Sequence, residues 1–257
     1  MKISIIGAGN MGGAIAKGLT RGSIVKAEDI TVSDLSEAAL NDLKLFNGNI
    51  NITRDNQEAI DGADVIVLAV KPWLAKEVIG RLQIDYQRQM IVSIAAGIPL
   101  ADFAGWTSTQ AVLFRLVPNT AISQLASMTL IASLNASREQ EQLILDIFNE
   151  LGLAMLVPEA QIAATTALTS CGIAYVLKYI QAGMQAGVEM GIYPKDAMKM
   201  VAQSVKGAAE LILNNDTHPA VEIDKVTTPE GITIKGINEL EHAGFTSAII
   251  KAMKASN

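Results

Sequence analysis

The N-terminal stretch Lys2–Gly12 constrains the fold more than any other part of the chain. It reads KISIIGAGNMG, so a short run of β-branched residues leads directly into the glycine pattern G-x-G-x-x-G, and residues 13–19 follow with helical spacing. Glycines at this spacing allow a tight turn, the close approach of a diphosphate and close packing of helix on strand. The helix N-terminus then offers free N–H groups to the phosphates. We therefore favour a dinucleotide site over a glycine turn kept for steric reasons, and the residues expected to bind it here are Gly7, Gly9, Asn10, Met11 and Gly12.

Strands and helices are expected to alternate over the first 157 residues. The strongest strand is the apolar run at 63–70, ADVIVLAV, which is typical of a strand buried on both faces of a parallel sheet. The other expected strands are 3–6, 30–33, 49–53, 90–94, 111–116, 127–132 and 154–157, with helices at 36–45, 56–60, 73–82, 100–103 and 138–151. This alternation predicts an α/β fold, a Rossmann-like doubly wound parallel sheet.

Ligands of such sheets bind at the carboxyl ends of the strands. Asp34 ends the second strand, 22 residues after Gly12, close to the spacing expected of an acid that binds the adenosine ribose. Asp34 can also be read as the N-cap of the helix at 36–45, and the two roles are compatible. Further cofactor candidates follow later strands, namely Ala69, Val70, Lys71, Pro72, Ala95, Ala96 and Gly97, and Asn119 is a candidate for binding the substrate.

The character of the chain changes at Pro158-Glu159. Helical spacing covers about 161–190, 194–214, 218–225, 231–243 and 246–255, and no strand is evident there. We therefore expect a dinucleotide-binding domain over 1–158, followed by an all-helical domain over 159–257 for dimerisation and substrate contacts.

Composition excludes several classes of protein. The net charge of −6 argues against a nucleic-acid partner. The single cysteine, Cys171, excludes an internal disulfide and suits a reducing compartment, so with a core strand at the N-terminus we expect a cytoplasmic protein. His218 and His242 are isolated, so no metal site is expected. Residues 162–177 are uncharged, but Lys178 ends the run short of the ~20 residues of a membrane span, which favours a buried interface helix.

Taken together, these motifs resemble the pyrroline-5-carboxylate reductase family. The residues that carry the resemblance are Gly7–Gly12, Val70–Pro72, Ser93–Ile98, Val117–Thr120, Thr166–Leu168, Ala174–Tyr175, Ala186–Val188, Gly191, His218–Pro219, Val226–Ile234, Glu241 and Gly244–Phe245. The resemblance covers essentially the whole chain. It implies that NAD(P)H reduces the C=N bond of 1-pyrroline-5-carboxylate to give L-proline, the last step of proline synthesis. It also implies a homodimer through the helical domain, often assembled into decamers.

The resemblance and the local pattern together place the substrate at residues 228–233. Thr228 followed by Pro229 is typical of an N-cap and a first helical residue, so the N–H groups of Gly231, Ile232 and Thr233 are expected to face the substrate carboxylate. The resemblance implies that the Thr233 hydroxyl lies near the ring nitrogen as proton donor. Plain capping by Thr228 and an exposed helical position for Thr233 are the alternatives.

Two departures from the family pattern bear on the substrate. The chain reads Thr169–Tyr175 as TSCGIAY where the family usually reads SGSGPAY, and Glu230 stands where the family usually has glycine. Glu230 adds a carboxylate near the expected anion site. A related imine or 2-hydroxyacid reductase with a changed pocket, or a non-catalytic nucleotide-binding homologue, is therefore an alternative. The charge of Asp34 would repel a 2′-phosphate, so we expect NADH to be accepted at least as well as NADPH.

Overall fold

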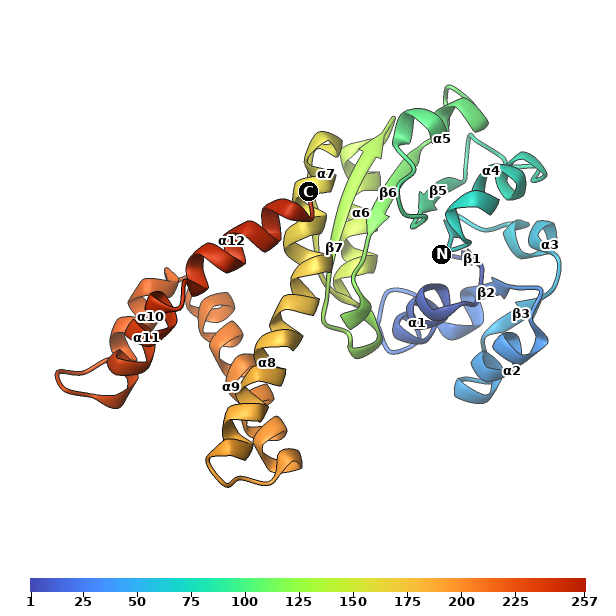
Figure 1. Ribbon diagram of the computed structural model, residues 1–257. Helices are drawn as coiled ribbons and strands as arrows, with labels where there is room; N and C mark the ends of the chain where they lie inside the picture. Colours follow the sequence, from blue (N-terminus) through green and yellow to red (C-terminus); the bar gives the residue numbers. More distant parts are fainter. The chain divides into compact units, whose positions relative to one another are not determined.

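The computed structural model describes residues 1–257, which form two compact units, Met1–Ser170 and Cys171–Asn257 (Figure 1). The expected boundary at 158/159 therefore falls inside the first unit, and residues 159–170 are packed with it.

Strands and helices alternate in the first unit, as predicted. Its strands are β1 (Ile3–Ile6), β2 (Ile30–Ser33), β3 (Asn51–Thr53), β4 (Val65–Leu68), β5 (Met90–Ser93), β6 (Leu113–Val117), β7 (Ser127–Leu134) and β8 (Gly152–Leu156). Its α-helices are α1 (Asn10–Leu19), α2 (Glu37–Phe46), α3 (Asn56–Ile60), α4 (Pro72–Gly80), α5 (Leu100–Trp106), α6 (Arg138–Asn149) and α7 (Ile162–Thr166). Short 3₁₀ helices η1 (Ala27–Asp29), η2 (Thr120–Gln124) and η3 (Glu159–Gln161) and a π-helical turn, η4 (Ala167–Cys171), complete the unit.

All eight strands form one sheet in the order β3-β2-β1-β4-β5-β6-β7-β8. Neighbouring strands are parallel except for β6 and β7, which pair antiparallel with Val117 opposite Leu130. The chain between them contains only the short helix η2, whereas a parallel crossover needs a dozen or more residues. The strand order reverses at β1, so the carboxyl ends of β1 and its neighbours β2 and β4 enclose the crevice where such sheets bind ligands.

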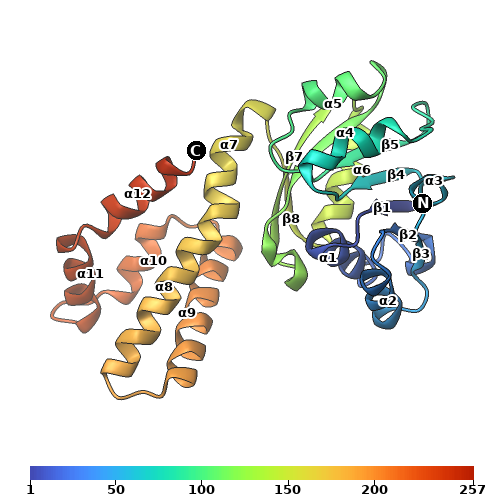
Figure 2. The same cartoon turned by 45° about the vertical axis from the view of Figure 1, so that its right-hand side comes forward.

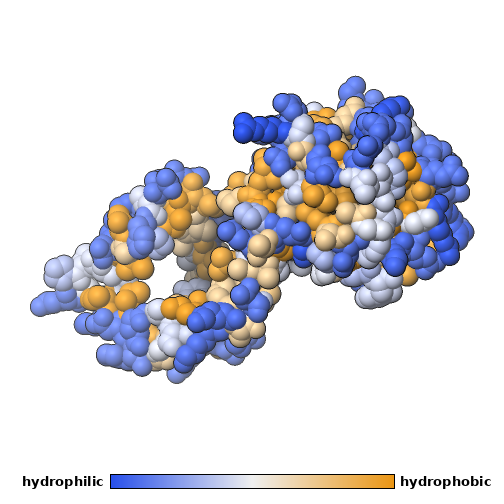
Figure 3. Space-filling view, turned by 90° about the horizontal axis from the view of Figure 1, so that it is seen from above, coloured by the Kyte–Doolittle hydropathy of each residue, from blue (hydrophilic) through white to orange (hydrophobic).

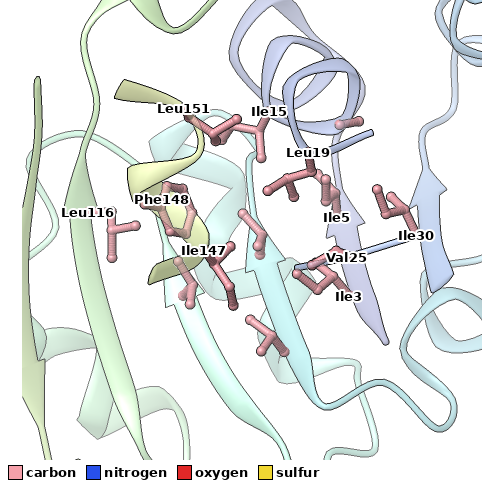
Figure 4. Close-up of a cluster of buried hydrophobic side chains, with 14 of the residues drawn as sticks. Ile3, Ile5, Ile15, Leu19, Val25, Ile30, Leu116, Ile147, Phe148 and Leu151 are labelled. Carbon is pink, nitrogen blue, oxygen red and sulfur yellow. The ribbon is translucent and has the colours of Figure 1, made fainter. Parts of the chain in front are cut away.

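The sheet is buried on both faces. On one face α1, α2 and α6 supply Ile15, Leu19, Leu43, Ile147 and Phe148 to a continuous apolar cluster (Figure 4). On the other face α3, α4, α5 and α7 supply the second cluster, with Ile60, Ile79, Phe103 and Ile162. All four residues of β1 and of β4 are buried, which explains why β4 is apolar throughout and why β1 is apolar except for Ser4.

The second unit is entirely helical, as predicted. It contains α8 (Gly172–Glu189), α9 (Pro194–Asn215), α10 (Pro219–Val226), α11 (Ile232–His242) and α12 (Phe245–Ala255). Helices α8 and α9 lie side by side as a hairpin (Figures 1 and 2), in which Gly183 and Gly187 of α8 face Val201 and Ala197 of α9. The hydroxyl of Tyr175 in α8 hydrogen-bonds Ser256 and the carbonyl of Ala252, which ties the end of α12 to α8.

Many large apolar side chains of this unit are exposed (Figure 3). Leu177 is 59% exposed and Leu213 71% exposed, for example. The segment Glu159–Glu189 is also long and apolar enough for a membrane span by length and composition alone. Burial between subunits accounts for the exposed side chains and for the apolar segment as well as a membrane would.

Candidate functional site

The glycine turn after β1 leaves room for a ligand on its outer side. A Cβ on Gly7, whose φ is +108°, would lie 2.6 Å from the carbonyl oxygen of Ala69, and one on Gly12 would lie 2.0 Å from that of Gly7. These two glycines therefore hold α1 against β1 and β4. Gly9 differs, because nothing lies within 4 Å of the position that its Cβ would take. Gly9 is the N-cap of α1 and no side chain caps the helix, so its first N–H groups face open space that suits a diphosphate.

A hollow of about 620 Å³ opens beside this turn. Most of the predicted cofactor residues line it, namely Gly7, Gly9, Asn10, Met11, Asp34, Ala69, Val70, Lys71, Pro72, Ala95 and Ala96. Gly12 and Gly97 do not line the hollow: Gly12 packs against Gly7, and Gly97 takes a left-handed conformation in the turn beyond Ala96. The structure thus gathers the ends of β1, β2, β4 and β5 around one site of dinucleotide size.

Asp34 is held in a fixed position at the β2 end of the hollow. One carboxylate oxygen accepts a hydrogen bond from the N–H of Ala8 at 2.6 Å, and the other accepts one from the N–H of Ser36 at 2.8 Å. Each oxygen keeps a free lone pair, so Asp34 can still accept a hydrogen bond from a ribose hydroxyl. The reading of Asp34 as the cap of α2 was wrong, because Ser36 is the N-cap and its hydroxyl accepts from the N–H of Ala39.

The sequence analysis missed an apolar part of the same hollow. Leu35, Leu74 and Val78 also line it, and Leu35, which follows Asp34 in the chain, is 79% exposed. An apolar side chain beside Asp34 suits the flat face of an adenine. A signal was present, since Leu35 directly follows Asp34 and Leu74 and Val78 are one helical turn apart on α4.

Lys71 and Pro72 mark the start of α4 as well as the end of β4. Lys71 is the N-cap residue without a side-chain cap, and Pro72 occupies the first helical turn, where its missing N–H costs nothing. The lysine therefore contributes to the hollow as a turn residue at a second helix N-terminus.

Asn119 is buried, and both the oxygen and the nitrogen of its side-chain amide are hydrogen-bonded within the protein. It is 6% exposed, its amide oxygen accepts from the N–H of Ala121 at 3.0 Å, and its amide nitrogen donates to the carbonyl oxygen of Thr169 at 3.1 Å. Thr169 lies in the π-helical turn η4, where the wider winding changes the directions of the carbonyl groups. Asn119 thus fastens the end of β6 to the segment that leads into the helical unit, a role that the sequence did not indicate.

Residues 228–233 come together in the second unit, although not as the sequence suggested. Thr228 is not the N-cap of α11; Gly231 is, and α11 begins at Ile232. The N–H of Gly231 donates to the carbonyl oxygen of Thr228 at 2.9 Å, and Glu230 has a φ of +59°. These residues therefore form a tight turn with Pro229 and Glu230 at its centre, and the N–H of Gly231 is not free for a ligand.

The N-terminus of α11 nevertheless remains open. No side chain caps it, and both Ile232 and Thr233 are exposed, Ile232 by 87%. A Cβ on Gly231 would lie 2.6 Å from the hydroxyl oxygen of Thr228, so the glycine is required for this close turn. The site thus offers the N–H groups of Ile232 and Thr233 and the hydroxyls of Thr228 and Thr233 as donors. Nowhere in the chain do three His, Cys, Asp or Glu side chains gather as a metal site would require.

Comparison with known proteins places both halves of the chain. Residues 159–257 match the profile of the pyrroline-5-carboxylate reductase dimerisation domain, and residues 2–97 match that of the coenzyme F420-dependent NADP oxidoreductases. The chain is 36% identical to pyrroline-5-carboxylate reductase of Methanosarcina acetivorans, over 99% of this chain and 96% of that protein. It is 35% identical to pyrroline-5-carboxylate reductase 1 of Dictyostelium discoideum over 99% of its length, but spans only 48% of that longer relative.

A solved structure agrees with these relatives. The crystal structure of Plasmodium falciparum pyrroline carboxylate reductase with NADP bound superposes with a TM-score of 0.86, at 26% identity, over 100% of this chain and 95% of that one. The Rossmann-like sheet followed by a helical oligomerisation domain is therefore the shared architecture. The family that the sequence motifs resemble is also the one given by these matches over the whole of this chain: the chain belongs to the pyrroline-5-carboxylate reductase family.

Proposed function

We propose that this protein reduces the C=N bond of 1-pyrroline-5-carboxylate with NAD(P)H to give L-proline. The observation that carries the proposal is the hollow of about 620 Å³ in which the glycine turn, Asp34 and the ends of β4 and β5 meet, in a chain that matches reductases of this name over its whole length. The bound nicotinamide supplies the hydride.

The protein's own residues bind and orient the two reactants. The open N-termini of α1 and α4 hold the diphosphate region, and Asp34 holds the adenosine ribose. The N–H groups of Ile232 and Thr233 at the start of α11 bind the substrate carboxylate, together with the hydroxyl of Thr228. The Thr233 hydroxyl donates a hydrogen bond at the ring nitrogen and keeps a proton there. Asn119 contributes to the substrate site indirectly, because its side-chain amide holds Thr169 in place at the carboxyl edge of the sheet.

The direct test is to add pyrroline-5-carboxylate and NADH or NADPH to the purified protein and to follow the loss of nicotinamide absorbance. Proline must appear in the amount of cofactor oxidised. Thr233→Ala should reduce kcat, by about a hundredfold if the hydroxyl acts as proton donor, whereas Thr233→Ser should retain most of it. An unchanged rate in Thr233→Ala would show that another group, such as water, protonates the ring nitrogen.

We further infer that NADH serves at least as well as NADPH. Asp34 is fixed by Ala8 and Ser36, and the neighbouring Leu35 provides no positive charge for a 2′-phosphate. The comparison of kcat/KM for the two cofactors tests this inference, and a preference for NADPH of more than a hundredfold would contradict it.

One observation favours a second candidate, a related imine reductase with a changed pocket. Glu230 carries an unpaired carboxylate in the turn before α11, where the family pattern has glycine, and like charges there would weaken the binding of an anionic substrate. Turnover of an uncharged cyclic imine at a higher kcat/KM than pyrroline-5-carboxylate would support this candidate.

We place the working enzyme in the cytoplasm as a homodimer joined through the helical domain, with decamers of five dimers as the larger assembly. The match of residues 159–257 to a dimerisation domain supports the dimer. The net charge of −6 supports a protein without a nucleic-acid partner, and the exposed apolar helices are assigned to subunit contacts instead of a membrane.

A further inference from the structure

A carboxylate outside the cofactor hollow reaches back to the loop that forms one of its walls. Glu159 is the first residue of η3 and also the first residue matched by the dimerisation domain profile. Its Oε1 atom accepts a hydrogen bond from the backbone N–H of Leu100 at 2.7 Å and another from the guanidinium of Arg115 at 2.9 Å. The side chains of Arg115 and Glu159 are 16% and 31% exposed, so the pair is partly shielded from water.

Leu100 opens α5, and its N–H is one of the groups that a helix leaves without a backbone partner. The N-cap residue of this helix is Pro99, whose side chain cannot accept a hydrogen bond. Glu159 therefore supplies from 59 residues away the cap that the local sequence lacks. The negative carboxylate also suits the positive end of the helix dipole.

The segment immediately before Leu100 lies in the cofactor hollow. Ile94, Ala95 and Ala96 line the hollow, and Gly97 follows with a left-handed φ of +78°. This loop is fastened at its start, where the N–H of Ile94 donates to the carbonyl of Leu68 at 3.1 Å and that of Ala95 to the Ser93 hydroxyl at 3.3 Å. Its far end is held by the hydrogen bond from the N–H of Leu100 to the carboxylate of Glu159.

Arg115 completes the connection on the sheet. It lies on β6 directly beside Ser93, the last residue of β5. The guanidinium thus joins the carboxylate of Glu159, at the far end of the loop, to the strand beside the one that the loop leaves. The carboxylate is stabilised by two donors from two different elements, which restricts its position more than one contact would.

The strand order assigns this loop to the nicotinamide half of the cofactor site. Asp34 at the end of β2 marks the adenosine side of the crevice, and the diphosphate lies at the glycine turn after β1. The end of β5 lies two strands beyond β1 on the side opposite to β2, so the loop after β5 borders the other half of the dinucleotide.

We propose that Glu159 is a positioning residue for the nicotinamide end of the cofactor. It acts through the N–H of Leu100 on the loop Ile94–Pro99, and Arg115 holds its carboxylate in place. Glu159 belongs to the dimerisation segment by sequence and to the cofactor-binding unit by contact, so it links the segment that joins the subunits to the nicotinamide pocket. This inference rests on the proposed function only in that the hollow binds a nicotinamide dinucleotide.

The test compares two ligands that share the adenosine half. NADH contains the nicotinamide, whereas ADP-ribose has the diphosphate and both riboses without it. Calorimetric titration of the full-length protein gives both dissociation constants. Glu159→Ala should weaken NADH binding by about three- to thirtyfold, in line with the loss of a helix cap, and leave ADP-ribose binding unchanged.

Glu159→Gln preserves the volume and an oxygen acceptor for Leu100, but removes the charge that Arg115 pairs with. It should weaken NADH binding by less than Glu159→Ala does, and it also serves if the alanine variant fails to fold. Ser137→Ala is the matched control, because Ser137 caps α6 through a capping box remote from the hollow. That control should lower the melting temperature and leave both dissociation constants unchanged.

An equal loss of both ligands in the Glu159 variants, or no loss of either, would overturn the proposal. Neither outcome depends on catalysis. If the wild-type protein binds NADH but does not reduce the imine, the proposed reaction fails while the role of Glu159 can still be tested.

Discussion

Gly12 shows how a single residue secures both the fold and the site. Replacement by alanine would place a methyl group 2.0 Å from the carbonyl oxygen of Gly7 and 2.9 Å from the Cβ of Ala69, so α1 must move away from β1 and β4. We expect Gly12→Ala to destabilise the protein by about 2–4 kcal/mol and to abolish measurable cofactor binding. Urea unfolding and NADH titration measure the two effects.

Gly9→Ala is the matched comparison, because its methyl group would meet no protein atom within 4 Å. It should leave stability nearly unchanged and still weaken cofactor binding, since the methyl group occupies the space expected for the diphosphate. Equal stability loss in both variants would contradict this division of roles between the two glycines.

Glu230 combines two separable costs, one of backbone conformation and one of charge. A left-handed φ costs a non-glycine residue about 1–2 kcal/mol. Glycine would relieve this cost, but the greater conformational entropy that it gives the unfolded chain offsets part of the gain. Glu230→Gly should therefore stabilise the protein by about 0.5–1 kcal/mol. Glu230→Gln keeps the strain and removes the charge, so it should leave the melting temperature unchanged and lower KM for pyrroline-5-carboxylate by about two- to fivefold. If Glu230→Gln raised KM, the carboxylate would be assisting the substrate.

At the scale of elements, the pattern of strands and helices was predictable from the sequence because it depends on local spacing. Apolar runs such as 63–70 and the helical periodicity after Pro158 signal their elements directly. The antiparallel β7 was not predicted, although the connection between the expected strands 111–116 and 127–132 is too short for a parallel crossover. The start of α11 was misplaced, because Thr228-Pro229 has the composition of a cap and only the left-handed Glu230 shows that the chain turns first.

The site residues that could be predicted are those that lie directly after a strand, in the turn that follows it. The cofactor residues at the ends of β1, β2, β4 and β5 belong to this class, and the hollow gathers most of them. The roles of Asn119 and Glu159 could not be predicted, because their partners lie 50 and 59 residues away in the sequence. Long-range hydrogen bonds of this kind leave no periodic signal.

Helix α10 offers a prediction about pH. Glu222 lies in its first turn, and the carboxylate of Glu222 accepts hydrogen bonds from Lys225 at 2.7 Å and from the hydroxyl of Thr217 at 2.6 Å. These bonds, that of Lys225 first, lower the pKa of Glu222 below its ordinary value. The contribution of Glu222 to stability is therefore present above the ordinary pKa of glutamate and is lost as the pH falls through the lowered value.

Thr217→Val removes one of the two donors without changing the size of the side chain. It should raise the pKa of Glu222 towards its ordinary value, which an NMR titration of the carboxyl group measures directly. An unchanged pKa in this variant would mean that Lys225 alone stabilises the ionised form. A Lys225→Met variant should raise the pKa more, in keeping with the order of the two causes.

For the whole molecule, the exposed apolar side chains of the helical unit indicate a contact with a second subunit. Leu177 on α8 and Leu213 on α9 are 59% and 71% exposed, and residues 159–257 match a dimerisation domain. A two-fold interface contains every substituted position twice, and burial of a leucine contributes about 1.5–3 kcal/mol. Leu177→Glu and Leu213→Glu should therefore each raise the dimer dissociation constant by about a hundredfold or more, as measured by sedimentation equilibrium.

Gln203→Glu, at an exposed polar position of α9, adds the same charge and should leave the dimer intact. Dimers unaffected by both leucine variants would place the subunit contact on another surface. In the expected case, loss of the dimer should lower activity more than NADH binding, because the hollow that binds the dinucleotide lies entirely within residues 1–170.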